Sequence, residues 1–162
     1  MINVRVVSNS SPLIILYKCD QLHLLERLFG HVFIPEAVRK EVIHSSKDPH
    51  QSEAISRCDF IKARSIPQSS ISFSRKLDRG EQEALILASA LKADYLLLDD
   101  KRAQKEANDL QIPFIPTLAV LLKASQKGII SDFEALLSEL EQKMVFLTRE
   151  LSLEVRNFLN PS

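Results

Sequence analysis

The stretch GEQEALILASALKADYLLLDD, residues 80–100, decides how this chain folds. Its first part predicts a helix over residues 80–92, because alanines and leucines recur there on one stripe at helical spacing. Residues 95–98 then form a continuous apolar run, which is typical of a strand buried on both faces of a parallel sheet. Two acids end that run. The stretch therefore predicts a helix, a buried parallel strand and an acidic strand end in succession.

The rest of the chain continues this alternation of strands and helices. Short apolar runs between turn residues indicate strands over residues 4–8, 32–34, 60–66, 95–98 and 113–115. Amphipathic segments indicate helices over residues 13–17, 22–28, 35–43, 80–92, 101–110, 117–127, 131–143 and 148–159. We expect Ser10 or Ser11 to cap the first helix, loop and short helix over 44–58, and a surface loop over 67–76. This order predicts a three-layer α/β/α domain with a central parallel sheet.

Length and composition favour one small globular domain. The chain has 162 residues and 45% apolar residues, and a domain of this size buries enough surface to fold without disulfides or metals. We expect the α/β domain to span residues 1–131. Residues 132–162 are expected to form a C-terminal helical extension that packs on the same domain.

Charge and motif content exclude several classes of protein. Basic and acidic residues both number 21, so any surface for nucleic acid must be local. The two cysteines and four histidines lack metal-ligand spacing, and no phosphate-binding glycine motif is present. The beginning of the sequence lacks a signal-peptide pattern, and no apolar run approaches the roughly 18 residues of a membrane span. We therefore expect a cytoplasmic protein with no membrane association.

Polar residues follow two of the predicted strands. Asn9 ends the first strand, and Asp99 and Asp100 end the strand over residues 95–98. The carboxyl ends of parallel strands meet at one edge of a sheet, where ligands bind in open α/β folds. Glu41 and Glu81 lie on the apolar stripes of their helices, where a carboxylate needs a cation, a hydrogen-bond network or a metal.

Each of these residues also has an ordinary structural explanation. Glu81 could favour a helix dipole, and Glu41 could lie at the margin of a stripe. Asp99 or Asp100 could cap the next helix, and Asn9 could be a turn residue. The combination favours a site, because all of these positions can meet in one cleft. Oxygen ligands without Cys or His suit Mg²⁺ or Mn²⁺, and such ions assist phosphodiester hydrolysis.

Four segments, in order, resemble the motifs of PIN-domain proteins. They are VVSNSSPLI at residues 6–14, IPEAVRKE at 34–41, DRGEQEA at 78–84 and LLLDDK at 96–101. The Gly128-Ile129-Ile130 segment also resembles the VapC-like branch of that family. The resemblance covers about residues 3–131. It implies a metal-dependent endoribonuclease, usually the toxin of a type II toxin–antitoxin pair, with Mg²⁺ or Mn²⁺ as cofactor. It also implies a homodimer and a small antitoxin that occludes the site.

The resemblance also carries over to individual residues. The positions that match the acidic motifs are Asn9, Glu41, Glu81, Asp99 and Asp100. Ser10 matches the hydroxyl residue after the first acid. Asn9 is a departure, because many PIN nucleases carry Asp there, although some members of this branch have Asn. An amide can bind a cation through its oxygen but supplies no charge. The spacing leaves open whether Asp99 or Asp100 is the main ligand.

Basic residues flank the predicted acidic cleft. Arg75, Lys76 and Arg79 precede Glu81, and Lys101, Arg102 and Lys105 follow the acidic strand end. Ser10, Arg79, Lys101 and Arg102 are the candidates for contact with RNA, although the basic groups could equally be a solvated face.

Two other functions compete with a nuclease. Asn9 favours a non-catalytic RNA- or protein-binding module on a decayed PIN fold, whereas the intact other acids oppose it. A receiver-type phosphorylation domain is disfavoured, because residues 32–66 offer no suitable acceptor aspartate at a strand end.

Overall fold

The structure, a computed structural model, describes residues 4–143, and the chain divides into two compact units, Met1–Thr117 and Leu118–Ser162. The second unit contains α8 (Phe133–Lys143) and all but the first residue of α7 (Thr117–Gln126). Gly128, at φ 75°, follows α7 where the sequence predicts a helix stop. The helix predicted over 148–159 lies outside the described residues. The domain boundary at residue 131 stays a prediction.

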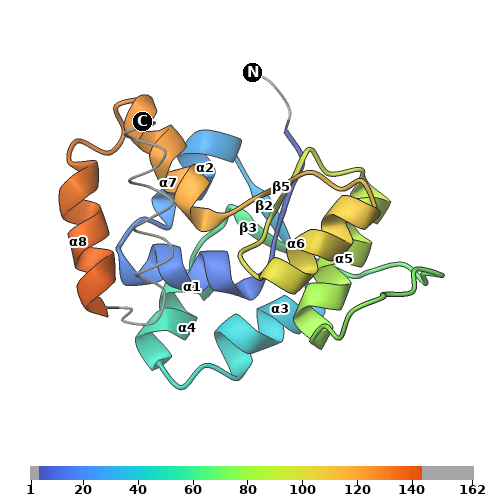
Figure 1. Ribbon diagram of the computed structural model, residues 1–162. Coiled ribbons are helices and arrows are strands. Elements are labelled where there is room, and N and C mark those ends of the chain that lie inside the picture. Colours follow the sequence, from blue (N-terminus) through green and yellow to red (C-terminus); the bar gives the residue numbers. More distant parts are fainter. Residues whose placement is uncertain (1–3, 144–162) are drawn as a thin grey trace. The chain divides into compact units, whose positions relative to one another are not determined.

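The first unit is built on a parallel sheet of five strands in the order β3-β2-β1-β4-β5 (Figure 1). The strands are β1 (Val6–Ser8), β2 (Val32–Pro35), β3 (Ile61–Arg64), β4 (Tyr95–Leu97) and β5 (Phe114–Ile115). The helices of this unit are α1 (Ser10–Lys18), α2 (His23–Phe29), α3 (Glu36–Arg39), α4 (Pro49–Ser56), α5 (Arg79–Leu91) and α6 (Lys101–Asp109), with a π-helical turn η1 (Lys40–His44) after α3. The predicted parallel sheet is therefore confirmed.

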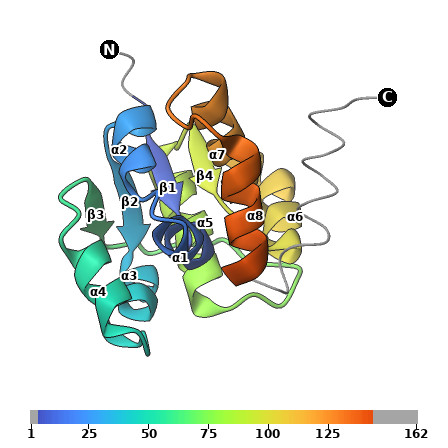
Figure 2. The ribbon, with the colours of Figure 1, turned by 90° about the vertical axis from the view of Figure 1, so that its left-hand side faces the viewer.

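Helices cover both faces of this sheet. Chain connections between parallel strands are right-handed, so the direction in which the chain moves across the sheet decides the face that each helix covers. The chain first moves from β1 to β3, which places α1, α2 and α4 on one face. It then crosses to β4 and β5, which places α5 and α6 on the other (Figures 1 and 2). The predicted three-layer architecture is confirmed.

The helix α5 packs its predicted stripe against the middle of the sheet. Ala84, Leu85 and Ala88 are almost fully buried, in one apolar cluster with Val7 of β1 and Leu96 of β4. Burying a leucine side chain contributes roughly 1.5–3 kcal/mol. This packing fixes the beginning of α5 beside the carboxyl ends of β1 and β4.

Most helix ends differ from the prediction by one to three residues, and three differences bear on the site. The residue at the N-cap of α1 is Asn9 rather than Ser10 or Ser11, and the Ser10 hydroxyl is bonded to Glu41 instead. The predicted helix over 35–43 breaks into α3 and the π-helical turn η1. The helix α5 begins at Arg79 rather than Gly80, because the side chain of Asp78 caps it.

The described part of the chain contains no helix whose length and hydropathy would allow it to cross a membrane.

Candidate functional site

Asn9 lies at the carboxyl edge of the sheet, where β1 and β4 end side by side. Its backbone N–H donates a hydrogen bond to the carbonyl oxygen of Leu97 over 3.0 Å. The residue is 6% exposed, and within residues 4–143 its side chain makes no hydrogen bond. Every side-chain nitrogen or oxygen in that range that is fully shielded from solvent has a hydrogen-bond partner. Because the side-chain amide of Asn9 has none, it must still be in contact with solvent. It is therefore available to a ligand at this edge.

Glu41 connects three elements at the same edge. The hydroxyl of Ser10, the first residue of α1, donates a hydrogen bond to Glu41 Oε2 over 2.8 Å. The Oε1 atom of Glu41 lies over Gly80 in the first turn of α5, where an added Cβ would collide with it. Burial raises the pKa of Glu41; the Ser10 hydrogen bond opposes this rise, and the nearby charge of Asp78 adds to it. The site is thus assembled from α1, η1 and α5.

The absence of a Cβ at Gly80 leaves room for the Glu41 carboxylate, which an added methyl group would have to push aside, and this leads to a test. We expect Gly80→Ala to displace the Glu41 carboxylate and to reduce any metal-dependent activity by roughly tenfold or more, on the scale of lost supporting contacts at metal sites. Stability should be unchanged or higher by up to about 1 kcal/mol, because alanine is the better helix former. Metal binding and urea unfolding of the variant check both effects.

A matched control separates this mechanism from general damage. If Gly80→Ala acts through Glu41, it should cost little further activity in a protein that already carries Glu41→Gln, because the two changes affect one contact. Additive losses would contradict the mechanism.

Glu81 and Asp78 form a reciprocal cap at the beginning of α5. Asp78 Oδ1 accepts a hydrogen bond from the backbone N–H of Glu81 over 2.8 Å, and Glu81 Oε1 accepts one from the N–H of Asp78 over 3.0 Å. Glu81 is 8% exposed. Burial raises its pKa to about 7, and the charges of Asp78 and Asp100 contribute to the rise. Glu81 therefore has the ordinary role of a residue in the first helical turn and also adjoins two further acids.

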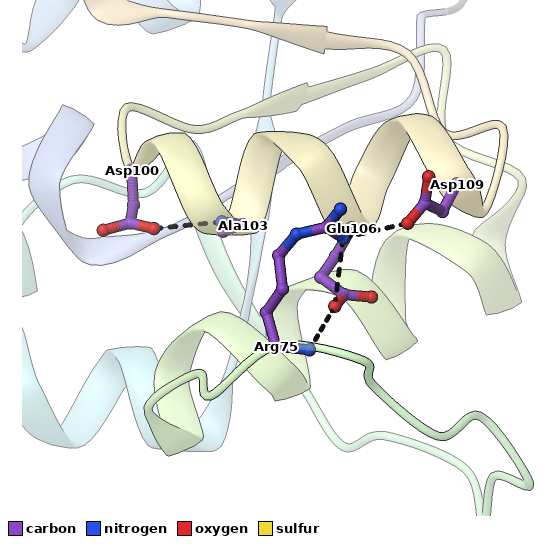
Figure 3. Close-up of polar contacts among 5 residues, drawn as sticks. All are labelled: Arg75, Asp100, Ala103, Glu106 and Asp109. Carbon is purple, nitrogen blue, oxygen red and sulfur yellow. Dashed lines mark hydrogen bonds and ion pairs between the residues drawn. The ribbon is translucent and has the colours of Figure 1, made fainter.

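Asp99 and Asp100, which the sequence does not distinguish, have different environments. Asp99 accepts two hydrogen bonds from Thr117, from its backbone N–H over 2.8 Å and from its hydroxyl over 2.6 Å. Burial raises the pKa of Asp99, and both bonds from Thr117 oppose this effect. Asp100 caps α6 by accepting a hydrogen bond from Ala103 N–H over 2.9 Å (Figure 3). Asp100 is the one that acts electrostatically on Glu81.

The three basic residues predicted to contact RNA are all exposed. Arg79, at the beginning of α5, forms an ion pair over 2.8 Å with Glu83, and its side chain is 82% exposed. Lys101 and Arg102 lie in the first turn of α6, directly after Asp100. All three residues therefore lie at the beginning of a helix, close to Asp78 or Asp100 in the sequence.

Arg75 is directed instead to the side of α6 (Figure 3). Its backbone N–H donates to Glu106 Oε1 over 2.6 Å, and its guanidinium group binds Asp109 over 2.9 Å. These interactions with Asp109 and Glu106 raise the pKa of Arg75. Arg75 therefore connects the loop between β3 and α5 to α6.

The sequence predicts no site role for three polar residues of this region: Asp78, Glu83 and Thr117. Glu83 is 7% exposed and accepts a hydrogen bond from the N–H of Ala37 at the beginning of α3. The pattern Asp-x-x-Glu at residues 78–81 is a capping-box signal that could have identified Asp78. No local sequence pattern predicts the contact of Thr117 with Asp99.

The donor set fits a hard divalent cation in its chemistry. In the described residues, no three acidic, histidine or cysteine side chains are already gathered as a preformed metal cage. However, burial and neighbouring carboxylates raise the pKa values of both Glu41 and Glu81, so their charged forms are disfavoured. None of the contacts described above brings a cationic side chain to either carboxylate. A divalent cation bound among these oxygens would relieve that repulsion.

Comparisons with known proteins identify the family and the fold of this chain. A family model described as a PIN domain matches residues 5–160. A solved structure of a PilT N-terminus domain protein from the hyperthermophilic archaeon Sulfolobus solfataricus is similar with a TM-score of 0.55 and 19% sequence identity. The likeness covers 75% of this chain and 93% of that one. A search of curated proteins gives no match.

Proposed function

This chain belongs to the PIN-domain family, and from that premise we propose that it is a Mg²⁺- or Mn²⁺-dependent endoribonuclease. PIN domains are in general nucleases that use divalent metal ions. The observation that supports the proposal for this chain is the position of Glu41, Glu81, Asp100 and Asn9 at one edge of the sheet, where the charge of Asp100 acts on Glu81 and Ser10, the residue after Asn9, is bonded to Glu41. Such oxygen donors suit magnesium or manganese.

Each residue has a distinct part in this proposal. Glu41, Glu81 and Asp100 would hold the metal, with Asn9 as a neutral oxygen donor. Ser10 orients Glu41 through its hydrogen bond. The bound metal would supply a Lewis acid for a phosphoryl oxygen and would make water more acidic.

The remaining residues support the site or bind substrate. Arg79, Lys101 and Arg102 would bind phosphates of the RNA on either side of the acids. Asp99 would position the strand end, because its two hydrogen bonds from Thr117 fix the orientation of its carboxylate.

RNA cleavage by the purified chain tests the proposal. We expect cleavage with Mg²⁺ or Mn²⁺, none with a chelator, and a loss of more than about 100-fold in Glu41→Gln, beyond what second-shell changes cost at metal sites. Glu53→Gln is a matched control, because Glu53 forms an exposed ion pair with Arg57 on α4. Equal activity in the wild type and Glu41→Gln would reject the proposal.

The alternative is a PIN fold that binds RNA or protein without cutting. Asn9 favours it, because an amide at the strand end adds no charge to attract a cation. RNA binding by a wild type that cleaves little, with a gain of cleavage in Asn9→Asp, would favour this alternative.

We also propose a cytoplasmic toxin that acts as a homodimer and is inhibited by a small antitoxin. The support is the resemblance of the four motifs and of residues 128–130 to VapC-like toxins. Expression of the chain should then arrest growth, and Glu41→Gln should abolish the arrest at equal protein levels.

A further inference from the structure

Asp78 lies at the acidic edge but has no place in the metal-binding set described above. We propose that Asp78 is an additional ligand of this site, supplying the divalent cation with a carboxylate oxygen beyond those of Glu41, Glu81 and Asp100. This inference rests on the proposed function and adds a residue to it.

The position of Asp78 is the first argument. A methyl group at Gly80 would collide with Glu41 Oε1 and would also lie 3.5 Å from Asp78 Oδ1, so both carboxylates converge on the same side of that glycine. The carboxylate of Asp78 also adjoins that of Glu81, with which it shares the reciprocal cap. Asp78 is therefore next to two of the proposed ligands.

The hydrogen bonding of Asp78 is the second argument. The cap of α5 uses only Oδ1, which accepts the N–H of Glu81. The Asp78 carboxylate also shares a side-chain hydrogen bond with Glu81, and within residues 4–143 it forms no ion pair with a lysine or an arginine. Capping alone does not require a charge, because Asn, Ser and Thr are also good N-caps. An aspartate here places a third carboxylate beside those of Glu41 and Glu81, and a cation bound among the three would offset their mutual repulsion.

The amide of Asn9 is an independent sign of a ligand at this edge. It is the side chain of a residue that is only 6% exposed, and within the described residues it makes no hydrogen bond, whereas the backbone N–H and carbonyl oxygen of Asn9 are both bonded. Ser10, the next residue, is bonded to Glu41, which itself lies against Gly80 and Asp78. The neutral donor at the strand end and the extra carboxylate at the helix cap thus belong to one edge. Asp78 would thus supply the negative charge that the neutral Asn9 does not bring to the site.

The test compares Asp78→Asn with Asp48→Asn in the complete chain. Both aspartates are N-caps, and Asp48 caps α4 by accepting hydrogen bonds from His50 and Gln51. Asparagine caps as well as aspartate, so both variants should fold like the wild type in circular dichroism and thermal unfolding. We expect Asp78→Asn to weaken Mn²⁺ binding, measured by titration calorimetry, at least tenfold, and Asp48→Asn to leave it unchanged.

The outcomes separate this inference from the proposed function. Wild-type affinity for Mn²⁺ in Asp78→Asn, with tight binding by the wild type, would overturn the role of Asp78 alone. Absence of Mn²⁺ binding in the wild type would reject the metal-dependent function and this inference with it. Asp78→Ser, which retains a cap without a charge, repeats the measurement if Asp78→Asn folds poorly, and the same tenfold loss is expected.

Discussion

Glu81→Gln is expected to reduce metal-dependent RNA cleavage by more than about 100-fold while the chain stays folded. Glutamine retains an Oε1 atom that can accept the hydrogen bond from Asp78 N–H, so the reciprocal cap of α5 survives. What the substitution removes is one negative charge from a buried position between Asp78 and Asp100. A large loss of activity without a loss of helix content would assign Glu81 to the chemistry rather than to the fold.

The same variant should change how stability depends on pH in the absence of metal. Glu81 has an ordinary pKa of 4.5 and a pKa of about 7 in the folded chain. The folded chain therefore binds more protons than the unfolded chain between these values, and its stability falls as pH rises from about 4.5 to about 7. The effect is on the order of 2 kcal/mol, because solvent reduces the full shift.

Urea unfolding with a chelator at pH 5 and pH 8 measures this effect. We expect the wild type to lose stability between the two values and Glu81→Gln to lose about 2 kcal/mol less. Adding Mn²⁺ at pH 8 should stabilise the wild type and have little effect on the variant. Identical pH dependence in the two proteins would show that Glu81 is not the group responsible.

The sequence was sufficient to predict the sheet edge but not how its acids divide their roles. The apolar stripe of α5 predicts that Glu81 is buried, and the ends of β1 and β4 predict that Asn9 shares an edge with Asp99 and Asp100. These predictions follow from local periodicity and from the geometry of parallel sheets. The tertiary partners of the side chains follow from neither.

Two contacts illustrate what local patterns cannot convey. The first is between Glu41 and Gly80, which are far apart in sequence. Glu41 lies in the π-helical turn η1, and its carboxylate occupies the place that a Cβ of residue 80 would take. The side chain of Asp99 is set by the path of β5, which brings Thr117 to it. Identical residues at adjacent positions therefore acquire different partners, and only the folded chain distinguishes them.

Asp99→Ala is expected to destabilise the fold more than any other single change at this edge. Thr117 is 3% exposed, so the variant would leave a buried N–H and a buried hydroxyl without their acceptor. Each unsatisfied buried donor costs roughly 1–3 kcal/mol, which gives a loss of about 2–6 kcal/mol for the pair. Urea unfolding measures it, with Asp48→Ala as the comparison for an ordinary helix cap, whose loss costs about 1 kcal/mol.

Asp100→Asn is expected to show the opposite behaviour, with little loss of stability and a clear loss of metal binding and RNA cleavage. Asparagine can still accept the hydrogen bond from Ala103 N–H, so α6 keeps its cap and the unfolding free energy should change by less than about 0.5 kcal/mol. The charge beside Glu81 is lost, however, and Mn²⁺ binding and RNA cleavage should fall together. A stable, inactive Asp100→Asn beside an unstable Asp99→Ala would assign metal binding to Asp100 and support of the strand end to Asp99. If Asp100→Asn cleaves RNA as the wild type does, Asp100 is only the cap of α6, and the metal must be held without it.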